Sequence, residues 1–138
     1  MLDLLSSQNT ELLFKLFFAA ALGFLMAYER RQHGKGAGMR TFGMIAVGSC
    51  LFTMVSMYGF VGADPSRIAA QIVTGIGFIG AGVIWKNGAD IVGITTAAGV
   101  WVAAAVGMAV AADLYFLATV TAVITILIFN ARKVMPSA

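Results

Sequence analysis

The chain has 138 residues, of which 60% are hydrophobic and 11% are charged, and its formal net charge is +3. Soluble domains carry about 25% charged residues, so this composition excludes an ordinary soluble protein and predicts an integral membrane protein. The single cysteine, Cys50, excludes an intrachain disulfide and a thiolate metal cluster. We expect Cys50 to be a small packing residue.

Apolar segments account for most of the length. Each membrane span needs about 20 apolar residues, and in chain order we predict spans at 12–28, 41–60, 65–85, 93–112 and 114–130. The predicted fold is therefore all-α, a compact bundle of about five transmembrane helices that forms a single domain over residues 1–138, with no soluble C-terminal domain. The first residues carry Asp3 and Glu11 where a signal peptide would carry basic residues, so we expect them to be retained.

The connections between the spans have distinct signals. The first loop, 29–40, is basic and rich in glycine. Asp64 and Pro65 predict an N-cap and a first helical position for the third span. The segment KNGAD, 86–90, predicts a turn, and Asp113 marks a tight connection before the last span.

Basic residues gather on one side of the predicted topology, and cytoplasmic loops hold such an excess. This bias predicts an external N-terminus and a cytoplasmic C-terminus, and it explains the positive charge without a nucleic-acid partner. Tyr28, Tyr58, Trp85 and Tyr115 fall near span ends, as interfacial aromatic residues should, whereas we expect Trp101 to pack inside. The basic residues on the cytoplasmic side are Arg30, Arg31, Lys35, Arg40, Lys86, Arg132 and Lys133, and those on the other side are Lys15 and Arg67.

A glycine-rich octapeptide, GIGFIGAG at 75–82, begins with the G-x-G-x-x-G spacing of dinucleotide-binding loops. A nucleotide site would need a preceding strand and an acid about 20 residues further on, and this sequence predicts neither. At about 100° per residue, Gly75 and Gly82 share one helix face, and Gly77 and Gly80 share the nearly opposite face. Because membrane helices associate through small residues, we expect the third helix to lie centrally, with neighbours on both sides.

Small residues also recur at every fourth position of the first and fourth spans. The density of these stripes predicts a compact bundle that pairs with another copy or with helices of another membrane protein, although each stripe alone is typical of generic packing. The stripes are Lys15, Ala19, Gly23 and Ala27, and Thr95, Gly99, Ala103 and Gly107. The predicted helix-packing glycines are Gly75, Gly77, Gly80, Gly82, Gly99 and Gly107.

Polar residues at membrane depth form the candidate ligand site. One interpretation is interhelical hydrogen bonding, and the other is a small hydrated cavity on the outer side, entered near Asp64 and Arg67. The residues of this predicted polar face are Asp64, Arg67, Gln71, Thr74, Thr95 and Thr96.

Acidic residues fall at predicted span borders, whereas an ion path usually needs an ionisable residue at membrane depth. Magnesium prefers oxygen ligands, so Asp64 with Asp113, or Glu29 with Asp90, could bind a hydrated ion, although neither pair forms an obvious cage. Asp64 and Glu29 are thus weak metal candidates, and we expect no cofactor, with a bound Mg²⁺ as the open alternative. Glu29 is explained more simply by an inner charged cluster with Arg30, Arg40 and Lys86.

Catalytic patterns do not emerge from the sequence: we find no nucleophile with its base, no metal-ligand cluster and no P-loop. These observations predict that the protein is not an enzyme and binds no nucleotide.

Four motifs in order resemble the MgtC/SapB family of bacterial membrane proteins, over about residues 14–112. They are ER at 29–30, GMRT at 38–41, DPSRIAAQIVTGIGFIGAG at 64–82 and GITTAAGVW at 93–101. The resemblance implies a multi-pass plasma-membrane domain of about five spans, associated with adaptation to low magnesium and, in some pathogens, with survival inside host cells. Members are often labelled magnesium transporters, yet the family is also described as regulatory.

Two positions depart from what the resemblance implies. Many relatives have a basic residue where this chain has Val92, and many continue into a soluble cytoplasmic domain where this chain ends at Ala138. Our leading hypothesis is a non-enzymatic regulator of magnesium homeostasis in the bacterial inner membrane, acting through helix contacts with another copy or another membrane protein. The alternatives are a small transporter or channel for Mg²⁺ or another ion, and a membrane scaffold or dimer without a role in ion levels.

Overall fold

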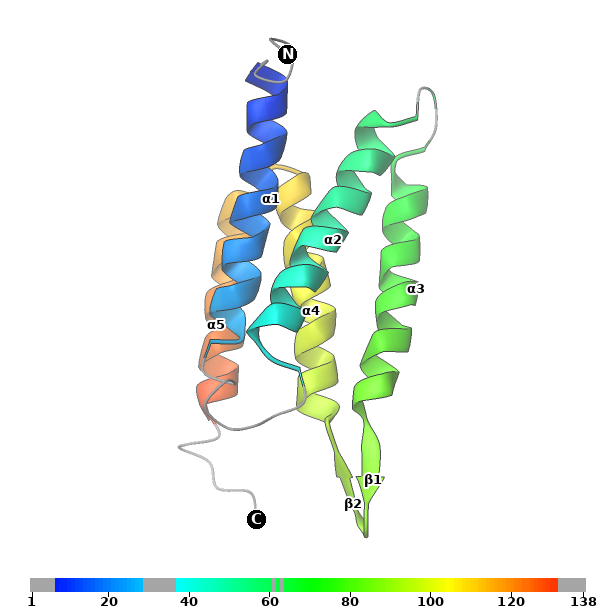
Figure 1. Ribbon diagram of the computed structural model, residues 1–138, viewed down its shortest axis with the longest axis vertical. Helices are drawn as coiled ribbons and strands as arrows, with labels where there is room; N and C mark the ends of the chain where they lie inside the picture. The colour runs from blue at the N-terminus through cyan, green and yellow to red at the C-terminus, as the bar shows by residue number, and fades with distance from the viewer. Residues whose placement is uncertain (1–6, 29–36, 61, 63, 132–138) are drawn as a thin grey trace.

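The computed structural model describes residues 7–28, 37–60, 62 and 64–131. Five helices, α1 (Ser7–Met26), α2 (Met39–Tyr58), α3 (Ser66–Val83), α4 (Ile94–Ala111) and α5 (Tyr115–Ala131), run alternately up and down (Figure 1). The predicted all-α bundle is confirmed. Two predicted site residues, Glu29 and Arg30, lie outside the described residues.

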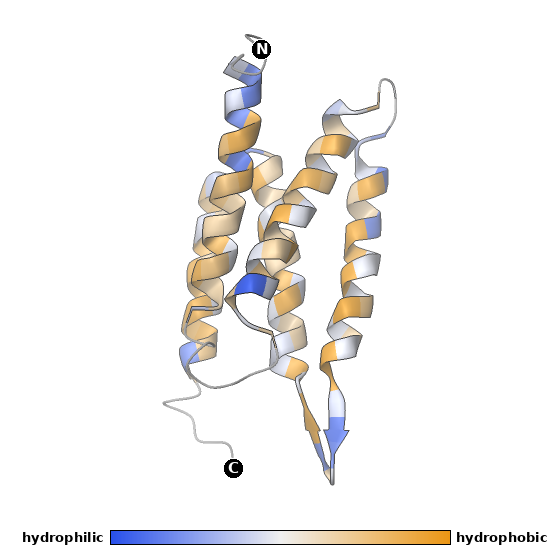
Figure 2. Cartoon of the chain, viewed as in Figure 1, coloured by the Kyte–Doolittle hydropathy of each residue, from blue (hydrophilic) through white to orange (hydrophobic). Residues whose placement is uncertain are grey.

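Four helices, α1 to α4, are long and apolar enough to cross a membrane, and α5 is a shorter apolar helix of 17 residues. At about 1.5 Å per residue α5 rises roughly 26 Å, and spans of about 17 residues are the shortest that cross a bilayer. Figure 2 shows apolar residues along the helices and polar residues mainly at their ends. We call the end with Lys15 and Asp113 the outer end, and the end with Arg40 and Lys86 the inner end, after the predicted topology.

The centre of the bundle is formed by α2 and α4, not by α3. Half of the α4 span is buried, against 11% of the α3 span. The buried residues of α4 include Gly99, Val100, Ala103 and Gly107. A Cβ on Gly107 would collide with the carbonyl oxygen of Ala46 in α2, so only glycine permits this approach of the two backbones.

The prediction that α3 lies centrally is wrong. A Cβ on Gly75, Gly77 or Gly82 would meet no atom within 4 Å, and one on Gly80 would make only an ordinary contact with Ala97 at 3.7 Å. These glycines are therefore not packing positions within the described part of one chain, apart from the loose contact of Gly80. The physical reason is that α3 turns Ile76 and Gly80 into the bundle and leaves its other glycines outside it.

Trp101 is a second correction. Its side chain is 51% exposed, so it does not pack inside the bundle as expected. By contrast, the stripe of α1 is buried at Lys15, Ala19 and Gly23. A Cβ on Gly23 would lie 2.7 Å from the carbonyl oxygen of Phe42, so α1 packs tightly on α2. Cys50 is fully buried and free.

A short hairpin joins α3 to α4 where the sequence predicted only a turn. Strands β1 (Trp85–Asn87) and β2 (Asp90–Val92) are antiparallel, with Trp85 opposite Val92 and Asn87 opposite Asp90. The φ of Gly88, +65°, lies in the left-handed region that favours glycine. An Asn-Gly pair between short runs is a known hairpin signal, so Asn87 and Gly88 could have revealed these strands.

Candidate functional site

The outward face of α3 carries most of the predicted polar face. Asp64 stands just before this helix, and Arg67, Gln71 and Thr74 are exposed along its first half. The Asp64 carboxylate accepts a hydrogen bond of 2.9 Å from the Ser66 backbone N–H, as expected of a helix cap. This hydrogen bond lowers the pKa of Asp64 below its ordinary value.

Thr95 and Thr96 lie elsewhere. They open α4 at the inner end, whereas Asp64 and Arg67 stand at the outer end of α3 (Figure 1). Thr96 is buried and Thr95 is exposed. The structure therefore does not bring the six residues of the predicted polar face into one site.

The inner charged cluster is only partly described. Arg40 is exposed at the start of α2 and Lys86 is exposed in β1. The two ion pairs within the described ranges both involve Lys15, so neither Arg40 nor Lys86 pairs with an acid there. In the same ranges no three His, Cys, Asp or Glu residues come together as metal ligands.

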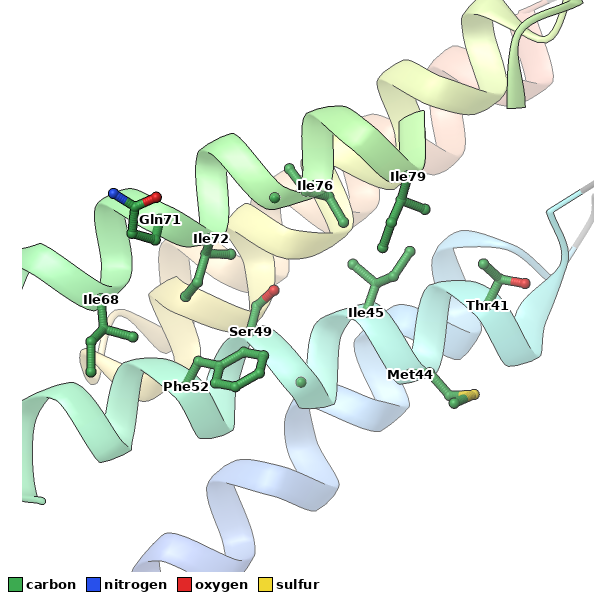
Figure 3. A pocket seen from close by; sticks show the side chains of 12 residues that line it. Thr41, Met44, Ile45, Ser49, Phe52, Ile68, Gln71, Ile72, Ile76 and Ile79 are labelled. Atoms are coloured by element: carbon green, nitrogen blue, oxygen red, sulfur yellow. The ribbon is translucent and has the colours of Figure 1, made fainter. Parts of the chain in front are cut away.

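An apolar groove separates α3 from α2 (Figure 3). Its volume is about 670 Å³, within the range of sites that hold small ligands. In Figure 3 the side chains of Ile79 and Ile45 point toward one another, and Ile68 and Ile72 point from α3 toward α2. A second apolar groove, of about 480 Å³, lies on the α4 side of α3. Only a small part of α3 is therefore in close contact with the bundle.

The walls of the α2–α3 groove have the spacing of a helix-packing seam. Thr41, Ile45, Gly48 and Phe52 on one wall and Ile68, Ile72, Gly75 and Ile79 on the other follow steps of four, three and four residues. Such spacing presents knobs and holes to a neighbouring helix. The groove is thus shaped for apolar side chains, and neither wall carries an ionisable group.

An ion pair of a buried lysine with exposed carboxylates, at the outer end, is the feature that sequence reasoning missed. The Lys15 side chain is fully buried, and its Nζ lies 2.9 and 3.0 Å from the two carboxylate oxygens of Asp113. It also lies 3.3 Å from a carboxylate oxygen of Glu11 and 3.4 Å from the Ala111 carbonyl oxygen. The Tyr115 hydroxyl donates to Asp113 over 3.1 Å. This outer ion-pair cluster joins α1 to the turn between α4 and α5.

Asp113 has an unusual backbone for a non-glycine residue, with φ of +64°. Its carboxylate is about half exposed, and the hydrogen bond from Lys15 lowers its pKa. The sequence did contain a signal for this pair. A lysine within a stripe of small packing residues would be buried, and a buried ammonium needs a carboxylate or carbonyl partner.

The comparisons with known proteins agree with this architecture. The model of the MgtC family matches residues 16–137. This chain belongs to the MgtC family. The expected resemblance to this family is confirmed, and the MgtC-family chain is a multi-pass membrane protein.

Three relatives show how much of the chain is shared. "Putative magnesium transporter YhiD" of Escherichia coli K12 is 48% identical over 88% of this chain and 60% of that protein. "Protein MgtC" of Brucella abortus strain 2308 is 44% identical over 78% of this chain and 45% of the relative. "Protein SapB" of Bacillus subtilis strain 168 is 40% identical over 78% and 50%, respectively. The MgtC-family chain thus spans roughly half the length of these relatives, and no solved structure matches it.

Proposed function

We propose that this MgtC-family chain is a non-enzymatic regulator of magnesium homeostasis in the bacterial inner membrane. It acts through contacts between the outward face of α3 and a second membrane-embedded chain. The magnesium link is supported by family membership and by the relative YhiD of Escherichia coli, which is named a putative magnesium transporter.

The uncovered face of α3 carries the proposal. Gln71 and Thr74 are exposed there, and Gly75 and Gly82 have open space where a Cβ would stand. A side-chain amide in hydrocarbon costs free energy unless it is hydrogen-bonded. Small residues allow a neighbouring helix to come close enough to supply that bond. A second helix would therefore stabilise this face better than lipid does.

The positions of the charged residues also favour a role through helix contacts over a role in ion transport. An ion path uses ionisable side chains at membrane depth whose partners change during transport. The buried Lys15 ammonium already has Asp113, Glu11 and the Ala111 carbonyl around it. Because the Lys15 ammonium already has these partners, it is suited to a fixed structural role.

A growth experiment tests the proposal. In a bacterium that lacks its own MgtC-family gene, expression of this chain should restore growth at limiting magnesium. Gly75→Leu should abolish the rescue, because it places a bulky side chain on the α3 face at a position where a Cβ meets no atom of its own bundle within 4 Å. Ala21→Leu, at an exposed position of α1, is the matched control and should keep the rescue.

A flux experiment separates regulation from transport. Purified chain in liposomes that contain a magnesium-sensitive dye should admit no more Mg²⁺ than protein-free liposomes. Saturable Mg²⁺ entry that disappears with Asp64→Ala would contradict the proposal and favour a transporter. Normal association of the chain with no effect on growth at low magnesium would instead favour a scaffold.

A further inference from the structure

We propose that the second chain on the α3 face is another copy of this protein. Two copies pack α3 against α3 around a two-fold axis along the membrane normal. Gln71 then meets Gln71 of the second copy, and Phe78 of each copy enters the α2–α3 groove of the other. This inference rests on the proposed function, because it names the partner of the same face.

The side-chain amide of Gln71 has no hydrogen-bond partner in the described part of one copy. Gln71 lies five residues after Ser66, which is about 8 Å along the helix axis. Its side chain is exposed at the rim of the α2–α3 groove and makes no hydrogen bond to any residue of the described ranges. Glutamine carries both a donor and an acceptor, so two glutamines related by a two-fold axis satisfy each other. A lipid acyl chain offers no such partner.

The Phe78 ring protrudes from α3 at the depth of the α2–α3 groove. Phe78 is 84% exposed and lies about one turn from Gly75, which lines the groove. Two copies inserted in the same orientation meet at equal depth, because their two-fold axis is parallel to the membrane normal. Phe78 of one copy is therefore level with Gly75 and Ile79 of the other.

Phe78 and the groove lie on opposite sides of Gln71, which allows the Phe78 ring of each copy to enter the groove of the other. At about 100° per residue, Gln71 lies between Phe78 on one side and Gly75, with the groove, on the other. A two-fold rotation about a contact at Gln71 places the ring of each copy on the groove side of its neighbour. The groove, with a volume of about 670 Å³, is large enough to accept an aromatic ring.

The outer end of α3 carries charges that are complementary between two copies. Asp64 and Arg67 are both exposed, one turn apart, and the Arg67 guanidinium forms no ion pair with the residues that the structure describes. In the paired arrangement Arg67 of each copy faces Asp64 of the other. The two charges thus add two equivalent salt bridges at the membrane surface.

Phe116 on α5 is an exposed ring whose helix lines neither of the two grooves, so exposure alone does not give a ring-in-groove contact. Phe116 on α5 is 82% exposed, nearly as much as Phe78. Neither of the two apolar grooves described above includes a residue of α5 within its helix bounds. Phe116 is therefore the matched control for Phe78.

Cysteine crosslinking of the full chain in membranes tests the contact. Gln71→Cys should give an oxidant-induced disulfide dimer, whereas Thr119→Cys should not, because Thr119 is exposed at a similar depth on α5. The native Cys50 is fully buried and stays in both variants, and the unsubstituted chain is the blank. Equal crosslinking of the two variants would overturn the homodimer.

Energy transfer between donor-labelled and acceptor-labelled copies in liposomes measures the strength of the pair. Phe78→Ala should raise the dissociation constant about tenfold, a typical size for one good contact between membrane helices, and Phe116→Ala should leave it unchanged. No difference between these two variants would overturn the ring-in-groove contact. Circular dichroism should give the same helix content for both.

The outcomes distinguish this inference from the proposed function. Crosslinking of Gln71→Cys only to a different membrane protein would overturn the homodimer and leave the regulatory proposal standing. A Gln71 crosslink between copies, together with no rescue of growth at low magnesium, would support the homodimer and contradict the regulatory proposal.

Discussion

Helices α3 and α4 are neighbours, and both are rich in glycine and alanine, yet they use these residues in opposite ways. On α4, glycine permits contact: a Cβ on Gly99 would collide with the Phe129 ring and one on Gly107 with the Ala46 carbonyl. On α3, Gly75, Gly77 and Gly82 face open space. The same composition thus gives a packed centre in one helix and an uncovered face in the other.

This difference teaches that a small residue marks a close approach only where a neighbour reaches it. The buried face of α4 is made of small residues and valines, so other helices lie close to it. α3 instead turns Ile76 and Gly80 to the bundle and leaves Gly75, Gly77 and Gly82 outside.

The largest loss of stability should come from replacing Gly107, the α4 glycine that packs against the α2 backbone. Gly107→Leu forces a side chain into the Ala46 backbone and should lower the free energy of unfolding by about 3 kcal/mol or more, the upper end of overpacking costs. Gly77→Leu, where a Cβ meets nothing within 4 Å, should change it by less than about 0.5 kcal/mol. Unfolding in mixed micelles, followed by circular dichroism, measures both. Similar losses in the two variants would contradict the contrast.

The next effect concerns the outer ion-pair cluster, which fixes α4 but not α3. Asp113→Asn removes the charge opposite the buried Lys15 ammonium and keeps a residue that tolerates positive φ. We expect a loss of about 2 kcal/mol, below the roughly 3 to 5 kcal/mol of a fully buried pair, because the carboxylate is half exposed. Asp90→Asn, on the exposed hairpin, is the control in the same unfolding assay. Equal stability of the two variants would show that the pair contributes little.

A smaller effect should come from the hydrogen bond that attaches the start of α3 to α2. The buried Ser56 hydroxyl donates to the Pro65 carbonyl oxygen over 2.6 Å. Ser56→Ala should cost about 1 kcal/mol and speed hydrogen exchange in the first turns of α3 more than in α4. Thr119→Ala loses a hydrogen bond to its own helix at an exposed position and should have little effect. Uniform exchange changes along the chain would contradict a local attachment.

The smallest effect is the pH dependence of the same outer cluster. The hydrogen bond from Lys15 lowers the pKa of Asp113 from its ordinary 3.8, so the folded state binds this proton less readily than the unfolded state. This contribution to stability is fully present above pH 3.8 and is lost as the pH falls through the lower, folded-state pKa. Asp113→Asn should therefore reduce the acid loss of stability. Identical pH profiles would show that another group, such as Asp64, dominates.

Much of the fold could be predicted from hydropathy and local signals. The five helices follow from apolar runs, and the cap at Asp64 follows from Asp-Pro chemistry, because each depends on residues close together in the chain. The hairpin was not predicted, although the Asn87–Gly88 pair is a local sequence signal for it. That error came from assigning Trp85 to a membrane span.

The candidate site was less predictable, because it depends on which helix faces meet. Helical periodicity placed Arg67, Gln71 and Thr74 on one face of α3, but not which neighbour, if any, covers it. Thr95 and Thr96 looked like members of the same polar set and instead lie at the opposite end of the bundle. Helical periodicity shows which residues share a face of one helix. It does not show which neighbouring helix that face contacts.

The sequence by itself determined a membrane protein of about five alternating helices, since hydrocarbon admits only long apolar segments with internal backbone hydrogen bonds. Only the tertiary structure decided that α4 is central and α3 peripheral, and that Lys15 meets Asp113 across 98 positions of the chain. The reason is physical. The order of spans is set by local transfer of side chains into lipid, whereas the pairing of their faces is set by contacts between residues that are distant in sequence.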